Sequence, residues 1–149
     1  MTAATKLVYL VRHARAQAQS PSGDAGRTLT EDGRAAFEAL VRGLATDLGI
    51  TRVVTSPFAR AVQTAAVLGA VLGVPVEREP TLAAGECTAR EVLRLAGRLG
   101  AGTALVGHNP ELAEAASAAA GHAVELPPGA IVALEGADDG WRFVWVRVP

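Results

Sequence analysis

The sequence predicts an α/β fold, a three-layer αβα sandwich built on a mainly parallel sheet. Short apolar segments rich in valine and leucine alternate four times with longer segments of helical periodicity. Two further apolar segments close the chain on either side of a turn signal, Asp138-Asp139-Gly140. The alternation is typical of a parallel sheet with helices on both faces, and the closing pair predicts antiparallel C-terminal strands. The 149 residues, 50% of them hydrophobic, suit a single domain over residues 1–149.

Six segments have the composition of strands. The first, KLVYLV, is an apolar run with β-branched and aromatic residues, which is typical of a strand buried on both faces of a sheet. The expected strands are residues 6–11, 51–55, 74–78, 103–106, 130–134 and 141–148.

Start and stop signals mark four helices. Thr30 is expected to cap the first helix, and Gly49 is expected to end it. Ser56 is expected to cap the second helix, with Pro57 at its first position, where the missing N–H costs nothing. The expected helices span residues 31–48, 57–72, 87–99 and 110–120.

The composition excludes several classes of protein. The formal net charge of −1 gives no general attraction to nucleic acid or to acidic membranes, so neither is expected as a partner. Cys87 is the only cysteine, so no internal disulfide can form and a cysteine-based metal site is not expected. Residues 1–6 lack the pattern of a signal peptide, and the longest apolar tract, residues 61–76, is too short and too interrupted to span a bilayer. We therefore expect a cytoplasmic protein.

Arginine and histidine side chains follow three of the expected strands. Arg12 and His13 come after the first strand, Ser56 and Arg60 after the second, and His108 after the fourth. Ligands of open α/β sheets bind beyond the carboxyl ends of the strands, so these side chains are expected to share one site. Arginine forks and helix N-termini both suit phosphate.

The chemistry that these residue types favour is phosphoryl transfer through histidine. A neutral imidazole attacks without first losing a proton, so His13 can serve as the nucleophile. Arg12 and Arg60 can stabilise the charge on the transferring phosphoryl group. The acidic residues do not cluster at metal-ligand spacing, so we expect a metal-independent reaction without a cofactor.

Three motifs in the sequence resemble those of the histidine phosphatase superfamily. They are LVRHA at residues 10–14, SPFARAVQTA at residues 56–65 and LVGHNP at residues 105–110. The short chain and the third motif are similar to the SixA-type branch of phosphohistidine phosphatases. The resemblance covers almost the whole chain. It implies a hydrolase that removes phosphoryl groups.

The resemblance also implies roles for individual residues. His13 would take the phosphoryl group, while Arg12, Arg60 and His108 would hold its oxygens, with Ser56 among the substrate-binding residues. The implied strand order is 3-2-4-1-5, with the fifth strand antiparallel, which places the first, second and fourth strands side by side.

The sequence departs from the family pattern in two places. Ala14 replaces the glycine of the first motif, which affects how closely a ligand can approach the backbone. Residues 79–86 stand where longer members of the family carry a cap insertion with an acidic proton donor, so no cap and an open pocket are expected. Asp24 and Glu86 are the candidates for the general acid. Four further arginines, Arg15, Arg27, Arg34 and Arg42, and also His122, are expected on the solvated surface.

Three functions remain open from the sequence. The first is a phosphohistidine phosphatase acting on a phosphorylated protein, the second a hydrolase of small phosphomonoesters, and the third a phospholigand-binding module without catalysis. The four core residues argue against the third. The lack of a certain proton donor favours the first function, because an imidazole leaves phosphorus with little protonation whereas an alkoxide must be protonated to leave easily. The open pocket favours it too, because such a pocket admits a side chain carried on another protein.

Overall fold

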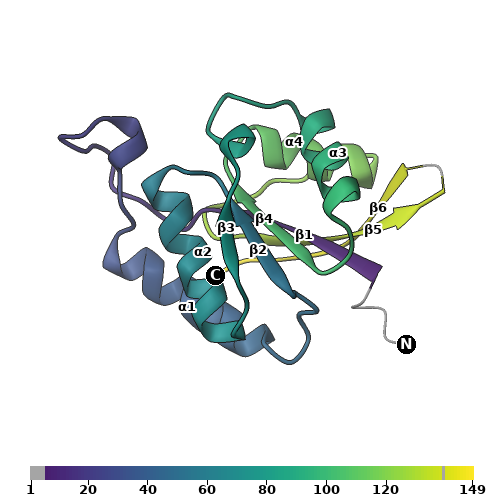
Figure 1. Ribbon diagram of the computed structural model, residues 1–149, viewed down its shortest axis with the longest axis horizontal. Coiled ribbons are helices and arrows are strands. Elements are labelled where there is room, and N and C mark those ends of the chain that lie inside the picture. The colour runs from purple at the N-terminus through teal and green to yellow at the C-terminus, as the bar shows by residue number, and fades with distance from the viewer. Residues whose placement is uncertain (1–5, 139) are drawn as a thin grey trace.

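A six-stranded sheet with the order β3-β2-β4-β1-β5-β6 organises the computed structural model, which describes residues 6–138 and 140–149 (Figure 1). The expectation of no signal peptide at residues 1–5 and the turn residue Asp139 lie outside the described residues. The strands are β1 (Leu7–Arg12), β2 (Arg52–Thr55), β3 (Val76–Arg78), β4 (Thr103–Gly107), β5 (Ile131–Ala137) and β6 (Gly140–Arg147). The predicted order and the antiparallel C-terminal strands are confirmed, with β6 added at the edge beyond β5.

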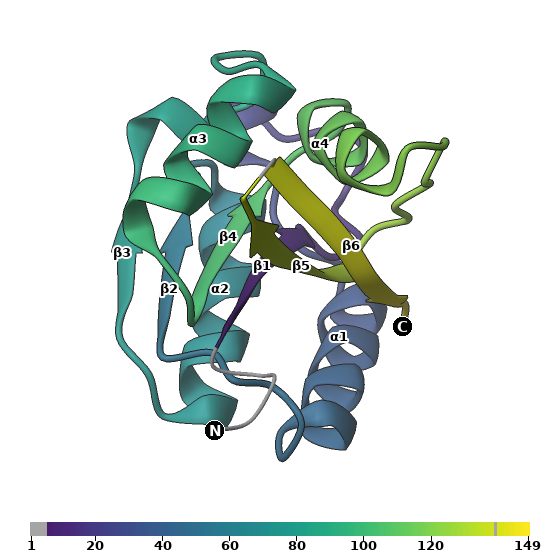
Figure 2. The same ribbon diagram turned by 90° about the vertical axis from the view of Figure 1, so that its right-hand side faces the viewer.

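Helices cover both faces of the sheet. They are α1 (Glu31–Leu44), α2 (Ala59–Leu72), α3 (Ala89–Leu99) and α4 (Glu111–Ala120). Figures 1 and 2 show α1 and α2 on one face and α3 and α4 on the other. Strand β1 serves both layers, because Tyr9 and Val11 pack with α1 and α2 whereas Val8 and Leu10 pack in the core under α3 and α4. This alternation, with both faces buried, is why residues 7–11 of the strand are all hydrophobic.

Helices α2 and α3 each begin two residues later than predicted. Helix α2 starts at Ala59 rather than Pro57, and its N-cap is Phe58 instead of Ser56. The hydroxyl of Ser56 accepts the N–H of Phe58 at 3.1 Å, so it supports a turn before the helix and does not cap it. Helix α3 starts at Ala89 because Thr88 forms a capping box with Glu91.

The other two helices also differ at one end. Helix α4 starts at Glu111, one residue after the predicted Pro110. Helix α1 ends at Leu44 rather than Leu48, because the next residues form a tighter turn in which the N–H of Asp47 bonds to the Leu44 carbonyl. Leu48 is nevertheless buried, so its contribution to the apolar face was predicted correctly.

The connection between β3 and α3 contains only the short 3-10 turn Pro80–Leu82, so the predicted absence of a cap insertion is confirmed. A different segment extends past the carboxyl ends of the strands. It is the loop before α1, residues 17–28, with a 3-10 turn at Asp24–Gly26, and Figure 1 shows it projecting from the body of the molecule.

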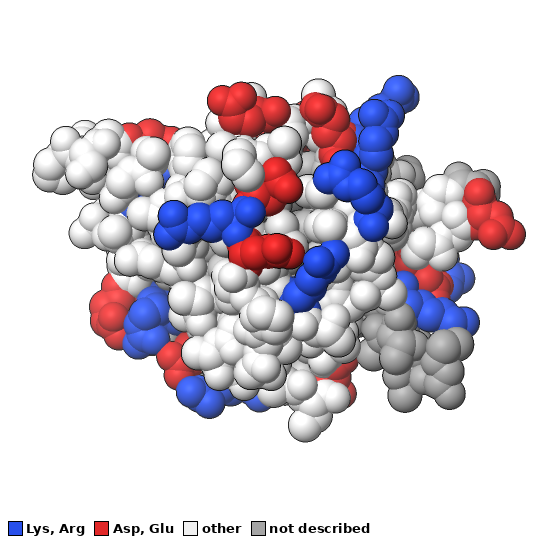
Figure 3. Space-filling model, in the orientation of Figure 1, with Lys and Arg blue, Asp and Glu red and all other residues white. Residues whose placement is uncertain are grey.

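The surface carries charges of both signs. In the face seen in Figure 3, acidic and basic side chains are interspersed, as the net charge of −1 leads one to expect. Within residues 6–138 and 140–149, no helix is both long enough and apolar enough to cross a bilayer.

Candidate active site

Strand register brings the sequence-predicted residues together at one edge of the sheet. Arg12 lies opposite Gly107 in the parallel pair of β1 and β4, so the next residues, His13 and His108, are neighbours. The hydrogen-bond ladder continues past the strand end, because the N–H of His13 donates to the Gly107 carbonyl at 3.1 Å. The centroids of the two imidazole rings are 5.3 Å apart. Helix α2, which follows the adjacent strand β2, adds Arg60 as its second residue.

His13 is buried, and its tautomer is determined by the backbone. Its Nδ1 lies 2.7 Å from the carbonyl oxygen of Ala14. A carbonyl only accepts hydrogen bonds, so Nδ1 carries the proton and Nε2 keeps a free lone pair. Burial lowers the pKa of His13 to about 4, and the charges of Arg60, Arg12 and Arg27 act in the same direction. The ring is therefore neutral at neutral pH.

The two arginines are held by backbone oxygens. Arg60 is 5% exposed and donates through Nη1 to the Asp24 carbonyl at 2.7 Å and through Nη2 to the Asp24 carboxylate at 3.2 Å. The centre of its guanidinium lies 5.1 Å from the centroid of the Phe58 ring. Arg12 donates through Nη1 to the carbonyl of Leu126 at 2.9 Å. Burial, together with the charge of Arg60, lowers the pKa of Arg12, yet a guanidinium stays charged at neutral pH.

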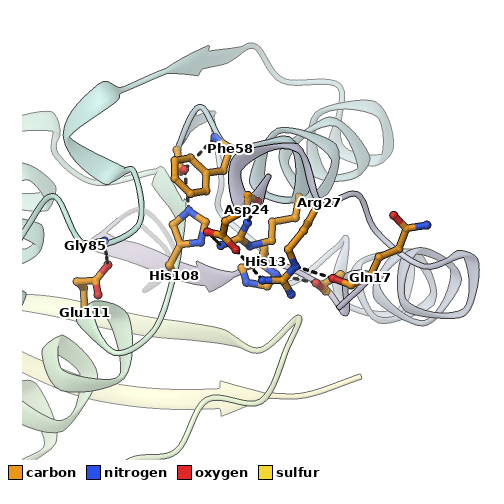
Figure 4. Close-up of polar contacts among 11 residues, drawn as sticks. His13, Gln17, Asp24, Arg27, Phe58, Gly85, His108 and Glu111 are labelled. Atoms are coloured by element: carbon orange, nitrogen blue, oxygen red, sulfur yellow. Dashed lines mark hydrogen bonds and ion pairs between the residues drawn. The ribbon is translucent and has the colours of Figure 1, made fainter. Parts of the chain in front are cut away.

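His108 is 3% exposed and lies against Ser56. Its Nε2 is 2.7 Å from the Ser56 hydroxyl, and Figure 4 shows the ring beside Phe58 and near Asp24 and His13. Burial is the main cause that lowers the pKa of His108 to about 3, with His13, Arg60 and Arg12 acting in the same direction and Asp24 opposing them. His108 is thus a neutral group at neutral pH.

Three nitrogen atoms of this site have no partner. Among the residues that the structure describes, the buried side-chain nitrogen and oxygen atoms without a hydrogen bond are Arg12 Nε, Arg60 Nε and His108 Nδ1. Buried polar groups are nearly always paired, so an unpaired set in one place indicates a ligand. Both arginine nitrogens are obligatory donors, and an anion with several oxygens is the ligand that would pair with them.

Ser56 occupies a different place from the one expected of a substrate-binding residue. It is fully buried, and its hydroxyl bonds to His108 and to the N–H of Phe58. These two contacts turn the hydroxyl toward the protein rather than toward a ligand.

The two candidates for the general acid are placed very differently. Asp24 lies at the site, where its carboxylate pairs with Arg60 and with Arg27, at 3.2 Å and 2.9 Å. The hydrogen bond from Arg27 is the main reason that the pKa of Asp24 is lowered. Glu86 is exposed, and in the described part of the chain no hydrogen bond or ion pair joins its side chain to Arg12, His13, Arg60 or His108.

Arg27 is a site residue that sequence reasoning missed. Its side chain is only 25% exposed, and its Nε donates to the carbonyl of Gln17 at 2.5 Å. Figure 4 shows it beside Asp24 and His13, whose pKa its charge lowers. The prediction of a solvated surface residue was therefore wrong. The spacing of an acid and a base three residues apart, within a loop that precedes a helix, was the available signal.

Further motif residues hold the site together. Thr64 accepts the N–H of Ala14 at 2.9 Å and donates to the carbonyl of Arg60 at 2.8 Å, so it links the first motif to the second. Gln63 accepts the N–H of Leu29 at 2.8 Å and anchors the end of the loop that carries Asp24.

The side chain of Ala14 is 1% exposed and packs in the core with α1 and α2, so the added methyl group points away from a ligand.

The site has no cluster of metal-ligating side chains: over residues 6–138 and 140–149, no group of three or more histidine, cysteine, aspartate or glutamate residues is placed to hold a metal ion.

Solved structures share this fold over nearly their whole length. The SixA protein from Agrobacterium tumefaciens is 24% identical, with a TM-score of 0.83 over 97% of this chain and 98% of that chain. The protein histidine phosphatase SixA in complex with tungstate is 23% identical, with a TM-score of 0.83 over 96% and 97%. A mycobacterial glucosyl-3-phosphoglycerate phosphatase, in complex with VO3, is 18% identical, with a TM-score of 0.72 over 94% and 98%. The comparison with curated proteins gives no match.

The sequence profile of one family matches residues 8–93, more than half of the chain, and these residues include His13 and Arg60. The strand order, the shared fold and this match agree, and the chain belongs to the histidine phosphatase superfamily (branch 1).

Proposed function

We propose that this protein is a metal-independent phosphatase that forms a covalent phosphohistidine on His13, with phosphohistidine on a protein as its substrate. Family membership supports a phosphatase activity. The observation that supports attack by His13 on a phosphoryl group is the set of three unpaired buried nitrogens, Arg12 Nε, Arg60 Nε and His108 Nδ1, around a neutral His13 with a free Nε2 lone pair.

The reaction has two balanced steps. In the first, the Nε2 lone pair of His13 attacks phosphorus, an N–P bond forms, and the bond to the leaving group breaks with its electron pair going to that group. In the second, the oxygen of water attacks phosphorus, one water proton passes to a phosphoryl oxygen so that dihydrogen phosphate forms, the N–P bond breaks, and the electron pair returns to Nε2. Arg12 and Arg60 stabilise the charge on the phosphoryl oxygens in both steps. This positive charge takes the place of a metal ion.

The protonation of the leaving group favours a phosphohistidine substrate. Asp24 is the candidate acid nearest to the site, but its pairing with Arg27 and Arg60 holds its pKa below the usual range. Such a carboxylate holds no proton at neutral pH and protonates an alkoxide poorly. An imidazole leaves phosphorus with little assistance, because the P–N bond is already labile. The SixA protein with tungstate is named a protein histidine phosphatase, which agrees with this proposal.

The proposal is tested by comparing leaving groups. We expect kcat/KM to fall steeply as the leaving-group pKa rises, with a phosphohistidine protein and aryl phosphates reacting well and alkyl phosphates poorly. Asp24→Asn should slow alkyl phosphates more than aryl ones if Asp24 donates the proton, and Glu86→Gln, an exposed carboxylate outside the site, is the matched control. A flat dependence, with sugar or glycerate phosphates as the best substrates, would replace the phosphohistidine proposal by the small-phosphoester one.

The covalent step has its own test. Acid quenching is avoided because a phosphoramidate is labile to acid, so the reaction is stopped with alkaline denaturant after brief mixing and digested for mass spectrometry. The phosphoryl group is expected on His13 and absent from His108 and Ser56. Turnover by His13→Ala near the wild-type rate would refute the nucleophile. Binding of phosphate by the wild type without any turnover would support a phospholigand-binding module instead.

A further inference from the structure

The hydroxyl of Ser56 has a choice of hydrogen-bond arrangements with His108. The oxygen lies 2.7 Å from Nε2 of His108 and accepts the N–H of Phe58 at 3.1 Å. A hydroxyl has one proton to donate and two lone pairs to accept with. The contact with Nε2 is therefore either a donation by Ser56 or a donation by His108.

The two arrangements leave different numbers of buried groups unpaired. If Nε2–H of His108 donates, the Ser56 proton has no acceptor among the hydrogen bonds of the described residues, and Nδ1 is an unpaired lone pair as well. If Ser56 donates to Nε2, the hydroxyl is fully paired and only Nδ1–H remains without a partner. Ser56 is fully buried and His108 nearly so, and each buried unpaired group is costly. The second arrangement is therefore the stable one.

From this geometry we infer that Ser56 is a positioning residue that holds the neutral His108 in its Nδ1–H tautomer, so that His108 presents a hydrogen-bond donor to the phosphoryl group. The inference rests on the proposed function, because that function supplies the phosphoryl group that accepts the hydrogen bond from Nδ1–H. It explains how a neutral His108 assists an anion, because the opposite tautomer would present a lone pair to the phosphoryl oxygens and repel them.

His13 provides an internal comparison. Its Nδ1 is protonated because the carbonyl of Ala14 accepts from it at 2.7 Å, so its Nε2 is the free lone pair. His108 has the same tautomer for the opposite reason, since a donor occupies its Nε2 and leaves Nδ1–H free. The centroids of the two rings are 5.3 Å apart. His13 thus presents a lone pair to phosphorus, and His108 presents a hydrogen-bond donor to a phosphoryl oxygen.

The tautomer is measured directly by long-range 1H–15N NMR of the full chain labelled with 15N-histidine at pH 7. Only three histidines are present, which makes assignment by single substitution practical. We expect the wild type to show His108 protonated at Nδ1 and unprotonated at Nε2. A wild-type spectrum with the proton on Nε2 would overturn the inference, whatever the variants do.

Variants at Ser56 then test whether its hydroxyl determines the tautomer of His108. Ser56→Ala should move His108 toward the Nε2–H tautomer and weaken vanadate binding about tenfold, the equivalent of roughly 1.4 kcal/mol. Ser56→Thr keeps the hydroxyl and should restore both properties. Thr55→Val is the matched control, because it removes a neighbouring buried hydroxyl that donates to the Ser56 carbonyl at 3.0 Å and touches neither ring.

The outcomes separate this inference from the proposed function. A loss of vanadate binding in Ser56→Ala with an unchanged His108 tautomer would overturn the positioning role. If Ser56→Ala does not fold, the tautomer of His108 in the wild type and in Ser56→Thr still tests the positioning role of Ser56. An Nδ1–H tautomer that depends on Ser56, in a protein that hydrolyses no phosphate compound, would uphold the tautomer and refute the phosphatase.

Discussion

Lowering the pH from 7 to 5 should leave His13 neutral and able to attack phosphorus. Burial and the surrounding arginines lower its pKa to about 4, from an ordinary value of 6.5. At pH 5 roughly 90% of such a group is neutral, against about 3% of a histidine with the ordinary pKa. The nucleophile is therefore about thirtyfold more abundant at pH 5 than an unperturbed histidine would be.

The assay is an NMR titration of the histidine ring signals between pH 8 and the onset of acid unfolding. The pH dependence of kcat/KM, corrected for ionisation of an aryl phosphate substrate, should retain activity at pH 5. A His13 signal that titrates near 6.5 would refute the argument that burial and nearby cations keep the ring neutral.

The same shift has a consequence for stability. Because the folded-state pKa of His13 lies below 6.5, the neutral ring contributes fully to the free energy of unfolding above pH 6.5. This contribution is lost as the pH falls toward 4. The difference of about 2.5 units corresponds to roughly 3 kcal/mol of unfolding free energy between pH 7 and pH 4. Urea unfolding should show a smaller loss over this range in His13→Gln, which cannot titrate. Equal losses in the two proteins would contradict the shift.

Three further predictions concern charge, metals and helix capping. Arg60→Lys keeps the charge but loses the planar guanidinium with its several N–H donors, so kcat/KM should fall about a hundredfold, or roughly 3 kcal/mol, whereas kcat/KM of Arg42→Lys, on the surface of α1, should be unchanged. A near-normal kcat/KM in Arg60→Lys would show that the guanidinium geometry of Arg60 is not needed. Exhaustive chelation should leave turnover unchanged while vanadate inhibits, and activity that is lost and then restored by a divalent ion would refute metal independence. Thr88→Ala removes the capping box of α3 and should cost about 1 kcal/mol in urea unfolding at unchanged kcat/KM, so a loss of activity at full stability would contradict a purely structural role.

Much of the fold could be predicted because its signals are local. Strand and helix periodicities are properties of neighbouring residues, and they placed all six strands and four helices to within a few residues. The main errors lie at helix ends: α2, α3 and α4 start later than predicted, and α1 stops earlier. At such positions the outcome depends on where a side chain points. Thr88 and Glu91 have the spacing of a capping box, a signal that the predicted start at Cys87 did not take into account. Ser56 has the residue type of an N-cap, but its hydroxyl lies against His108 instead.

The sequence by itself determined which chemistry is available: two histidines and two arginines after strands, in motifs of one family, and no provision for a disulfide. Only the tertiary structure decided how these groups act. The sheet order placed His13 beside His108, and the loop before α1 brought Asp24 and Arg27 over Arg60. The protonation of both histidines, the tautomer of His108 and the pairing of the arginines depend on burial and on contacts between residues far apart in the chain, and no local pattern encodes the distance between those residues.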